Sequence, residues 1–238
     1  MKRCGVLRVY RVSGGMRSPH PLAMADVSDV FLAGGLALVP TETVYGIGVA
    51  VAAFDGTGTQ PAEMPPEGSG YRRMFSLKQR DLVQTVPWLV AGEDALDVYG
   101  RDVGEETHTL AHTFWPGALT LVVKASDAVP GFMRAGDGTV ALRASASPVI
   151  QGLIRACGSP LAVTSANTHG APAPASFVEV EQRVLAGVDV AIDAGVTPCR
   201  SASTIVSCIS GHVKIIREGA LSADRIEDAL RPASDCLS

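Results

Sequence analysis

The sequence predicts an α/β fold built around a mixed sheet. Short apolar runs with the composition of strands alternate with segments in which apolar residues recur at helical spacing. Two such runs near the C-terminus, 203–208 and 213–216, lie close enough to pair as a hairpin, which favours a mixed sheet over an all-parallel one. The chain has 238 residues, of which 47% are hydrophobic and 18% charged, which is typical of one globular domain with short extensions.

The N-terminal third is predicted to contain strand, helix and strand in that order. Residues 1–21 form an extension whose β-rich run at 6–12 is expected to be a strand. A helix is predicted over 26–33, because its apolar residues are three and four apart and Gly34-Gly35 follows. The apolar run 36–39 is then a buried strand. It leads directly into the polar segment PTETVYG, and such strand ends often carry ligand sites in α/β sheets.

The rest of the chain continues the alternation after a segment of different composition. Residues 54–70 are rich in Gly and Pro and are expected to form an exposed loop or insertion. Trp115-Pro116-Gly117 ends one helical run, and Gly158 caps another. The expected helices are 71–77, 94–99, 105–114, 148–157, 176–185 and 222–230, and the expected strands are 86–90, 119–123, 139–143, 161–164, 188–192, 203–208 and 213–216.

Charge and cysteine content exclude several classes of protein. The formal net charge is −4, whereas dedicated nucleic-acid binders usually have a basic surplus. No apolar run approaches the ~20 residues of a membrane-spanning helix. The five cysteines include no CxxC pair, which indicates reduced thiols in a cytoplasmic protein. The first 25 residues contain five Lys or Arg and no acidic residue, so a targeting peptide is an alternative to the N-terminal strand.

Two short polar motifs are candidates for anion binding. Lys78 and Arg80 flank one residue in SLKQRD, and two cations so close repel unless an anion lies between them. The alternative is a solvated basic turn. Ser165 and Asn167 follow an apolar strand in VTSANTHG, where short polar side chains and a glycine can form a nest of donors for phosphate or carboxylate. The alternative there is an ordinary turn.

Hydroxyl and arginine side chains at other strand ends are further candidates. Thr43 lies with two other hydroxyl residues in PTETVYG, where hydroxyls either orient a small ligand or cap the strand. Arg143 lies in the apolar strand VALRAS, and a buried arginine requires either an acidic side chain or a bound anion. Arg217 poses the same question, and Ser203 suits either a ligand contact or a plain strand start.

No metal site or covalent nucleophile is predicted. His108 and His112 are four apart on an expected helix, but no third ligand is evident, so we assign no metal ligands. The chain contains no GxSxG, Walker loop, HExxH or strand-associated GxGxxG motif.

The motifs taken together resemble one family. They occur in the family's order, as PTETVYGIG, KQR, FWPGALTLVV, VALR, LAVTSANTHG, ASTIV and IIREGAL, over about residues 22–221. This set resembles the YrdC family of threonylcarbamoyl-adenylate synthases in a single-domain form, with its paired KxR and SxN signature. The resemblance implies a twisted mixed sheet with flanking helices around a positively charged cavity. It places the catalytic domain at 22–225, with an insertion at about 54–70 and a tail at 226–238.

The resemblance also implies a reaction. Members of the family convert ATP, L-threonine and bicarbonate to threonylcarbamoyl-AMP and pyrophosphate, for the modification of adenosine 37 in tRNA. The product passes to tRNA threonylcarbamoyl transferase proteins, and Mg²⁺ accompanies the ATP.

The implied residue roles fall into two groups. Lys78 and Arg80 are expected to be catalytic. The ATP contacts implied are Lys78, Arg80, Gln84, Thr139, Ser165, Asn167 and Arg217, and the threonine contacts implied are Thr43, Arg143 and Ser203. Asp81 and Leu89 depart from the family pattern, in which Pro and His are usual. The rival hypotheses are weak RNA binding through the same concavity, a different carbamoyl-adenylating enzyme, and a nucleotide-binding paralogue without activity.

Overall fold

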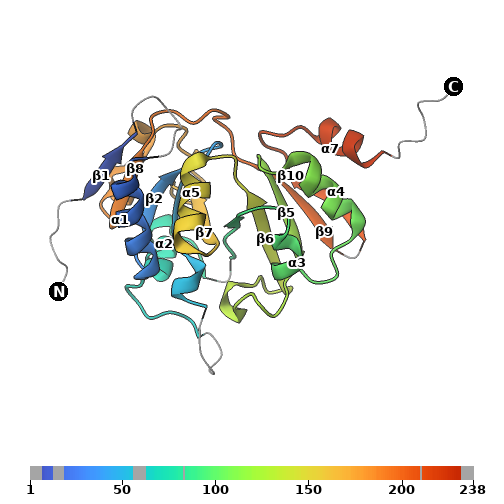
Figure 1. Cartoon of the computed structure of the whole chain (residues 1–238), viewed down its shortest axis with the longest axis horizontal. Helices are drawn as coiled ribbons and strands as arrows, with labels where there is room; N and C mark the ends of the chain where they lie inside the picture. The colour runs from blue at the N-terminus through green and yellow to red at the C-terminus, as the bar shows by residue number, and fades with distance from the viewer. Residues whose placement is uncertain (1–6, 13–18, 56–62, 83, 210, 232–238) are drawn as a thin grey trace.

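The computed structural model describes residues 7–12, 19–55, 63–82, 84–209 and 211–231. These residues form a 10-stranded mixed sheet in the order β1-β8-β2-β3-β7-β4-β6-β5-β9-β10 (Figure 1), which confirms the predicted fold class. Four of its strand pairs are parallel, namely β1/β8, β2/β8, β4/β6 and β5/β9. The strands are β1 Arg8–Arg11, β2 Ala37–Pro40, β3 Tyr45–Ala50, β4 Trp88–Val90, β5 Leu119–Lys124, β6 Thr139–Ala144, β7 Leu161–Ser165, β8 Val190–Asp193, β9 Thr204–Ile209 and β10 His212–Arg217.

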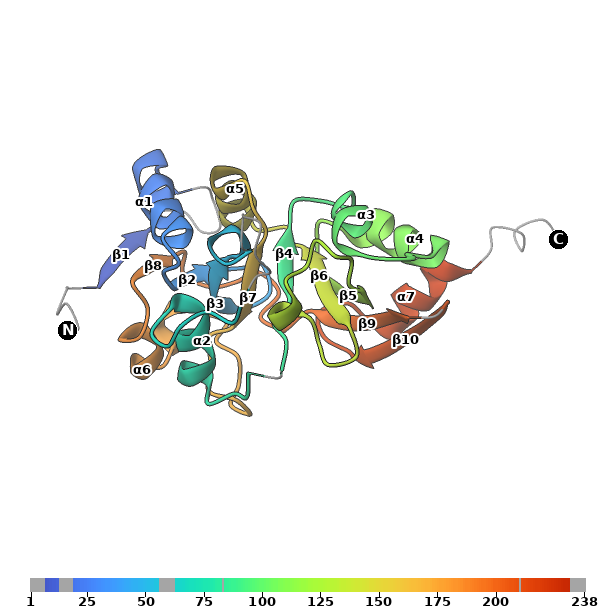
Figure 2. The ribbon, with the colours of Figure 1, turned by 90° about the horizontal axis from the view of Figure 1, so that it is seen from below.

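Helices cover both faces of the sheet. They are α1 Pro21–Leu32, α2 Gly70–Lys78, α3 Ala95–Tyr99, α4 Glu105–Phe114, α5 Pro148–Cys157, α6 Gln182–Leu185 and α7 Ala223–Leu230, with single 3₁₀ turns at Val51–Ala53, Gly131–Met133 and Phe177–Glu179. Figure 2 shows α1 and α5 on the opposite side of the sheet from α2. None of the helices among the described residues has the length and apolar character needed to cross a membrane.

Alternation along the strands supplies a separate core for each face. On β2, Ala37 and Val39 pack beneath α1 and α5, whereas Leu38 packs on the other side with the buried residues of α2. This follows from the period of two in an extended chain, which sends successive side chains to opposite faces. The apolar run 36–39 is therefore buried throughout, as predicted.

The central strand β4 is short, and the site lies beside it. It has three residues, and only Trp88 and Leu89 pair with β7, while the full strand pairs in parallel with β6. Beyond that pairing, the cavity described below is lined by the ends of β7 and β6 and by the segment that leads into β4. In Figure 2, β4 lies between the half of the sheet that ends in β1 and the half that ends in β10.

Three elements differ from the sequence prediction. Helix α1 begins at Pro21 and not at residue 26, because proline suits the first helical position and His20 caps the helix. Strand β3 was not predicted, because Gly46 and Gly48 look like turn residues. In the structure a Cβ on Gly48 would lie 2.6 Å from the carbonyl oxygen of Ala162, so glycine permits close approach to β7. The helix predicted over 176–185 is instead a 3₁₀ turn followed by α6, since Glu181 between them is extended and its carboxylate accepts from the Thr168 amide.

The expected domain limits fall on particular elements. Strand β1, within the expected extension, pairs in parallel with β8 at the edge of the sheet. The expected tail boundary at residue 225 falls inside α7, whose Ile226 is buried in the core. Residues 56–62 of the expected insertion at 54–70 lie outside the described residues.

Replacing Ser147 by alanine should destabilise the protein by about 0.5–2 kcal/mol. Ser147 is the N-cap of α5, where its buried hydroxyl accepts from the Ile150 amide and donates to the Pro40 carbonyl at 3.0 Å. Ser222 is a matched control, because it precedes α7 without a side-chain capping bond. Urea denaturation should therefore show a lower free energy of unfolding for Ser147→Ala and little change for Ser222→Ala, and equal losses would contradict this account.

Candidate functional site

The predicted site residues converge on one cavity of about 420 Å³ between the two halves of the sheet. Its charged lining residues are all cationic: Lys78, Arg80, Arg143 and Arg217. Hydroxyl groups also face it, from Thr41, Thr43, Thr85, Thr120, Thr164, Ser165 and Ser203. A concave site with several convergent donors and a net positive charge suits an anionic ligand.

Lys78 joins the two predicted anion-binding motifs. It is the last residue of α2, which ends because Gln79 adopts a left-handed conformation at φ 52°. The Lys78 Nζ donates to the carbonyl oxygens of Ser165 at 2.6 Å and Asn167 at 2.8 Å, with both side-chain oxygens also within 3.3 Å. The KxR and SxN motifs are therefore one physical unit, although Lys78 and Ser165 are 87 residues apart.

The environment of Lys78 changes its acidity. Burial, and secondarily the nearby charge of Arg80, lowers the pKa of Lys78 from its usual value to about 8. Glu181 opposes this shift more weakly. The acceptors of the ammonium group are neutral carbonyl, hydroxyl and amide oxygens, so these hydrogen bonds do not neutralise its positive charge.

Arg80 is held at the cavity by the segment that leads to β4. Its Nε donates to Gln84 Oε1 at 2.7 Å, and its Nη2 donates to the Thr85 carbonyl at 2.7 Å. Burial lowers the pKa of Arg80. Gln84 itself is exposed and does not line the cavity, so the structure shows it as a partner of Arg80.

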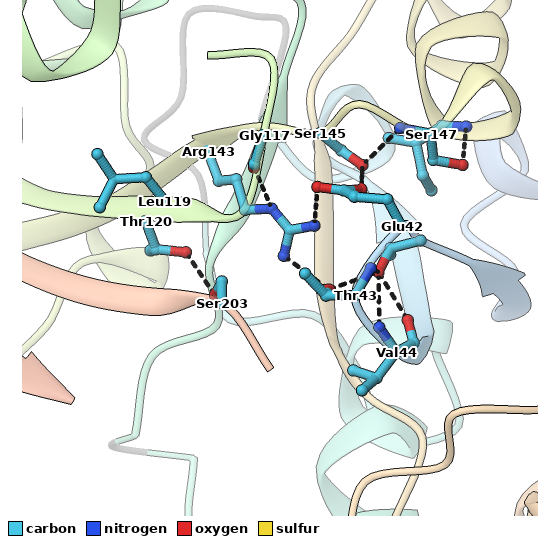
Figure 3. A network of polar contacts seen from close by, with 12 residues as sticks. Glu42, Thr43, Val44, Gly117, Leu119, Thr120, Arg143, Ser145, Ser147 and Ser203 are labelled. Atoms are coloured by element: carbon cyan, nitrogen blue, oxygen red, sulfur yellow. Dashed lines mark hydrogen bonds and ion pairs between the residues drawn. The ribbon is translucent and has the colours of Figure 1, made fainter. Parts of the chain in front are cut away.

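Arg143 has an acidic partner, which answers one of the questions left open by the sequence. The side chain is 7% exposed, and its Nη2 donates to Glu42 Oε1 at 2.5 Å. Its Nε donates to the Gly117 carbonyl and its Nη1 to Thr43 Oγ1, each at 3.1 Å (Figure 3). The guanidinium is thus fixed on three sides while it still lines the cavity.

The opposite wall comes from β5, β9 and β10. The hydroxyls of Thr120 and Ser203 are hydrogen-bonded at 2.9 Å, and Arg217 Nη2 donates to the Ser203 carbonyl at 2.7 Å. Arg217 lies at the exposed rim, yet loss of solvent around its guanidinium, followed by the charge of Arg143, lowers its pKa. Ser203 and Arg217 therefore act as neighbours across the hairpin that the sequence predicted.

Eight of the ten predicted site residues line the cavity: Thr43, Lys78, Arg80, Arg143, Ser165, Asn167, Ser203 and Arg217. Gln84 and Thr139 do not. Thr139 lies at the start of β6, four residues before Arg143, and its hydroxyl donates to Asp137 at 2.7 Å. Leu89, one of the departures from the family pattern, lies beside Arg143 in the β4/β6 register and lines the cavity.

Sequence reasoning missed Glu42, Thr85 and Thr120 as members of the site. Glu42 lies in PTETVYG between two threonines, whose hydroxyl groups were the predicted ligand contacts of this segment. The signal available was an acidic residue directly after a buried strand in a chain that also has a buried arginine to neutralise. Thr120 is hidden in the apolar strand LTLVVK, where only the three-dimensional pairing with Ser203 distinguishes it.

The two histidines of α4 interact with carboxylates of the α3 region. His108 Nε2 lies 3.4 Å from Asp97, and His112 Nδ1 lies 3.4 Å from Glu93. Within the described ranges there is no group of three His, Cys, Asp or Glu side chains that could hold a metal ion.

The affinity of the cavity for polyanions should fall as the pH rises above about 8. The folded-state pKa of Lys78 is about 8, so its ammonium group is charged below that pH and progressively neutral above it. If triphosphate binding requires the charged form, affinity falls by up to about tenfold per pH unit. Calorimetric titration with inorganic triphosphate from pH 7 to pH 10 checks this prediction. An unchanged affinity would show that the charge of Lys78 does not contribute to triphosphate binding.

Comparison with known proteins places this site in context. The family model Sua5_yciO_yrdC, described as "Telomere recombination", matches residues 65–219. The Pyrococcus abyssi protein named threonylcarbamoyl-AMP synthase is 32% identical over 197 residues, which cover 83% of this chain and 54% of that protein. A Mycobacterium tuberculosis (strain H37Rv) relative is 33% identical over 198 residues, which cover 83% and 84% of the two chains.

A solved structure supports the same relationship. The crystal structure of P. abyssi Sua5 complexed with L-threonine superposes with a TM-score of 0.80 at 27% identity, covering 95% of this chain and 61% of that one. The chain therefore spans little more than half of the P. abyssi protein.

Proposed function

Because the chain belongs to the Sua5/YciO/YrdC family, we propose that it forms threonylcarbamoyl-AMP and pyrophosphate from ATP, L-threonine and bicarbonate. The observation that carries this proposal is the single cavity that holds both a caged ammonium group beside Arg80 and a fixed guanidinium beside Thr43. The first group suits a polyphosphate and the second a carboxylate. Relatives named threonylcarbamoyl-AMP synthase support the pairing of these two ligands.

We assign the residues to two ligands. Lys78, Arg80, Ser165, Asn167 and Arg217 would contact ATP, and Thr43, Arg143 and Ser203 would contact threonine. Gln84 would act through Arg80, and Thr139 would contact ATP only if the nucleotide extends along β6 toward its first residue.

The mechanism needs placement and charge rather than a covalent intermediate. The amine of threonine and bicarbonate would give a carbamate, whose oxygen attacks the α-phosphate and displaces pyrophosphate. Holding the reactants in one cavity lowers the entropic barrier. Lys78 and Arg80 would stabilise the charge that develops on the phosphates.

Mg²⁺ would enter with the nucleotide. Glu42, the carboxylate held against Arg143, has its oxygens bonded to Arg143 and Ser145, and the cavity lining itself contributes hydroxyl and amide oxygens. Mg²⁺ is commonly bound by substrate phosphates, waters and few protein ligands. The donor set therefore fits an ion held mainly by ATP, where it would neutralise phosphate charge.

The product would serve the modification of adenosine 37 in tRNA in the cytoplasm, with transfer by tRNA threonylcarbamoyl transferase proteins. Any RNA binding would be weak, because the net charge of the chain is −4.

The test is pyrophosphate release from ATP by the purified protein, with and without L-threonine and bicarbonate. Release that requires both supports the proposal. ATP binding without release would instead indicate an inactive paralogue, and salt-sensitive RNA binding without release would indicate an RNA-binding protein.

A further inference from the structure

The positive charges of the cavity are not equally compensated. Lys78, Arg80 and Arg217 donate to carbonyl, hydroxyl and amide oxygens, which carry no net charge. Arg143 differs, because Glu42 lies directly against its guanidinium. Glu42 therefore balances the charge of Arg143, whereas the acceptors that the structure describes for Lys78 and Arg80 are uncharged, and Arg217 lies on the Arg143 side of the cavity against Ser203.

The carboxylate of Glu42 is buried and fixed beside the guanidinium of Arg143. It is 7% exposed, and its Oε1 accepts from Arg143 Nη2 at 2.5 Å while its Oε2 accepts from the buried hydroxyl of Ser145. Its backbone carbonyl accepts from the Cys199 amide at 2.9 Å. The carboxylate is thus held by Arg143 and Ser145, and the backbone of Glu42 by the segment after β8. Figure 3 shows the carboxylate on the far side of the guanidinium from Thr120 and Ser203.

Arg143 keeps the capacity to bind a ligand in spite of this pairing. A guanidinium has five N–H donors. Three are occupied by Glu42, Thr43 and Gly117, which leaves two for a group in the cavity. A carboxylate can accept both, so the pair presents directed donors with little net charge.

We propose that Glu42 is a specificity-determining residue that reserves the Arg143 end of the cavity for a zwitterionic amino acid and excludes phosphate-like anions from it. This inference rests on the proposed function, since it assigns threonine to Arg143 and the triphosphate to Lys78 and Arg80. An unpaired buried guanidinium would attract any anion, and a dianion such as sulfate or a phosphate group more strongly than a zwitterion of zero net charge. Neutralisation by Glu42 weakens that attraction at Arg143 and leaves the triphosphate to Lys78 and Arg80.

The test uses sulfate as a phosphate-like probe against wild type, Glu42→Gln, Glu42→Asp and Ser145→Ala. In wild type, sulfate should raise the KM for ATP and leave the KM for L-threonine nearly unchanged. In Glu42→Gln, sulfate should also raise the KM for L-threonine, by about fivefold or more. Glu42→Asp, which keeps the charge, should restore the wild-type pattern, and Ser145→Ala should show no new competition because it leaves the carboxylate in place.

Calorimetry with sulfate alone supplies a measurement that does not depend on activity. Glu42→Gln should bind one more sulfate than wild type, and Ser145→Ala should not. Equal stoichiometry in wild type and Glu42→Gln, or competition between sulfate and L-threonine in wild type, would overturn the proposal. Competition in wild type would overturn the proposal even if Glu42→Gln does not fold. Absence of pyrophosphate release by wild type would instead refute the proposed function, which the sulfate stoichiometry does not require.

Discussion

Replacement of Lys78 by methionine should lower kcat/KM for pyrophosphate release by about 10²–10³, or roughly 3–4 kcal/mol of transition-state stabilisation. Methionine keeps the length and much of the volume of the side chain but removes the ammonium group. The loss has two parts. The charge that faces the phosphates disappears, and the carbonyl oxygens of Ser165 and Asn167 lose the donor that holds their loop.

Two variants separate these parts and control for the change. Lys78→Arg keeps the charge with a different donor geometry, so partial activity is expected if charge dominates and little activity if the loop geometry dominates. Lys124→Met changes an exposed lysine of β5 that does not line this cavity, and it should keep wild-type kinetics. Initial rates of pyrophosphate release at saturating L-threonine and bicarbonate are the measurement. Wild-type activity in Lys78→Met would show that the catalytic role assigned to Lys78 is wrong.

Features of the structure that depend on residues close together in the sequence were predictable. Helix α5 shows this most clearly, because Ser147, Pro148 and Gly158 mark its start and end as local signals. The strands β5, β6, β7 and β9 likewise lie within one residue of the predicted limits, because their apolar runs are bounded by polar or turn residues. Eight of the ten candidate residues line the cavity because strand ends of a mixed sheet meet where the central strand is short.

The features that were missed depend on contacts between distant segments. Strand β3 contains Gly46 and Gly48, and only their close approach to β7 explains glycine in a strand. Helix formation over 176–185 is interrupted because Glu181 binds Thr168, a residue of a different loop. Glu42 and Arg143 are 101 residues apart. The sequence therefore indicates that a buried Arg143 needs a partner, but it does not identify Glu42 as that partner.

Replacement of Arg143 by methionine should destabilise the protein by about 3–5 kcal/mol and also raise the KM for L-threonine by about tenfold to hundredfold. The first effect arises because Glu42 would remain buried without its positive partner, and Ser145 alone cannot compensate the charge. The second arises because methionine lacks the two remaining N–H donors that the guanidinium would offer to the substrate carboxylate. Urea denaturation and threonine-dependent pyrophosphate release measure the two effects separately.

The double variant Glu42→Gln/Arg143→Met tests whether the Glu42–Arg143 pair affects stability through its charge or through its packing. If the cost of Arg143→Met is the uncompensated carboxylate, the double variant should recover most of the lost stability, since it buries no charge at this position. The KM for L-threonine should not recover, because methionine still offers no donor. Additive losses of stability would mean that the pair acts through packing alone, and recovery of the KM would mean that the threonine carboxylate is not bound by Arg143. The two measurements respond differently because stability depends on the balance of buried charge, whereas substrate binding depends on the donors that remain free.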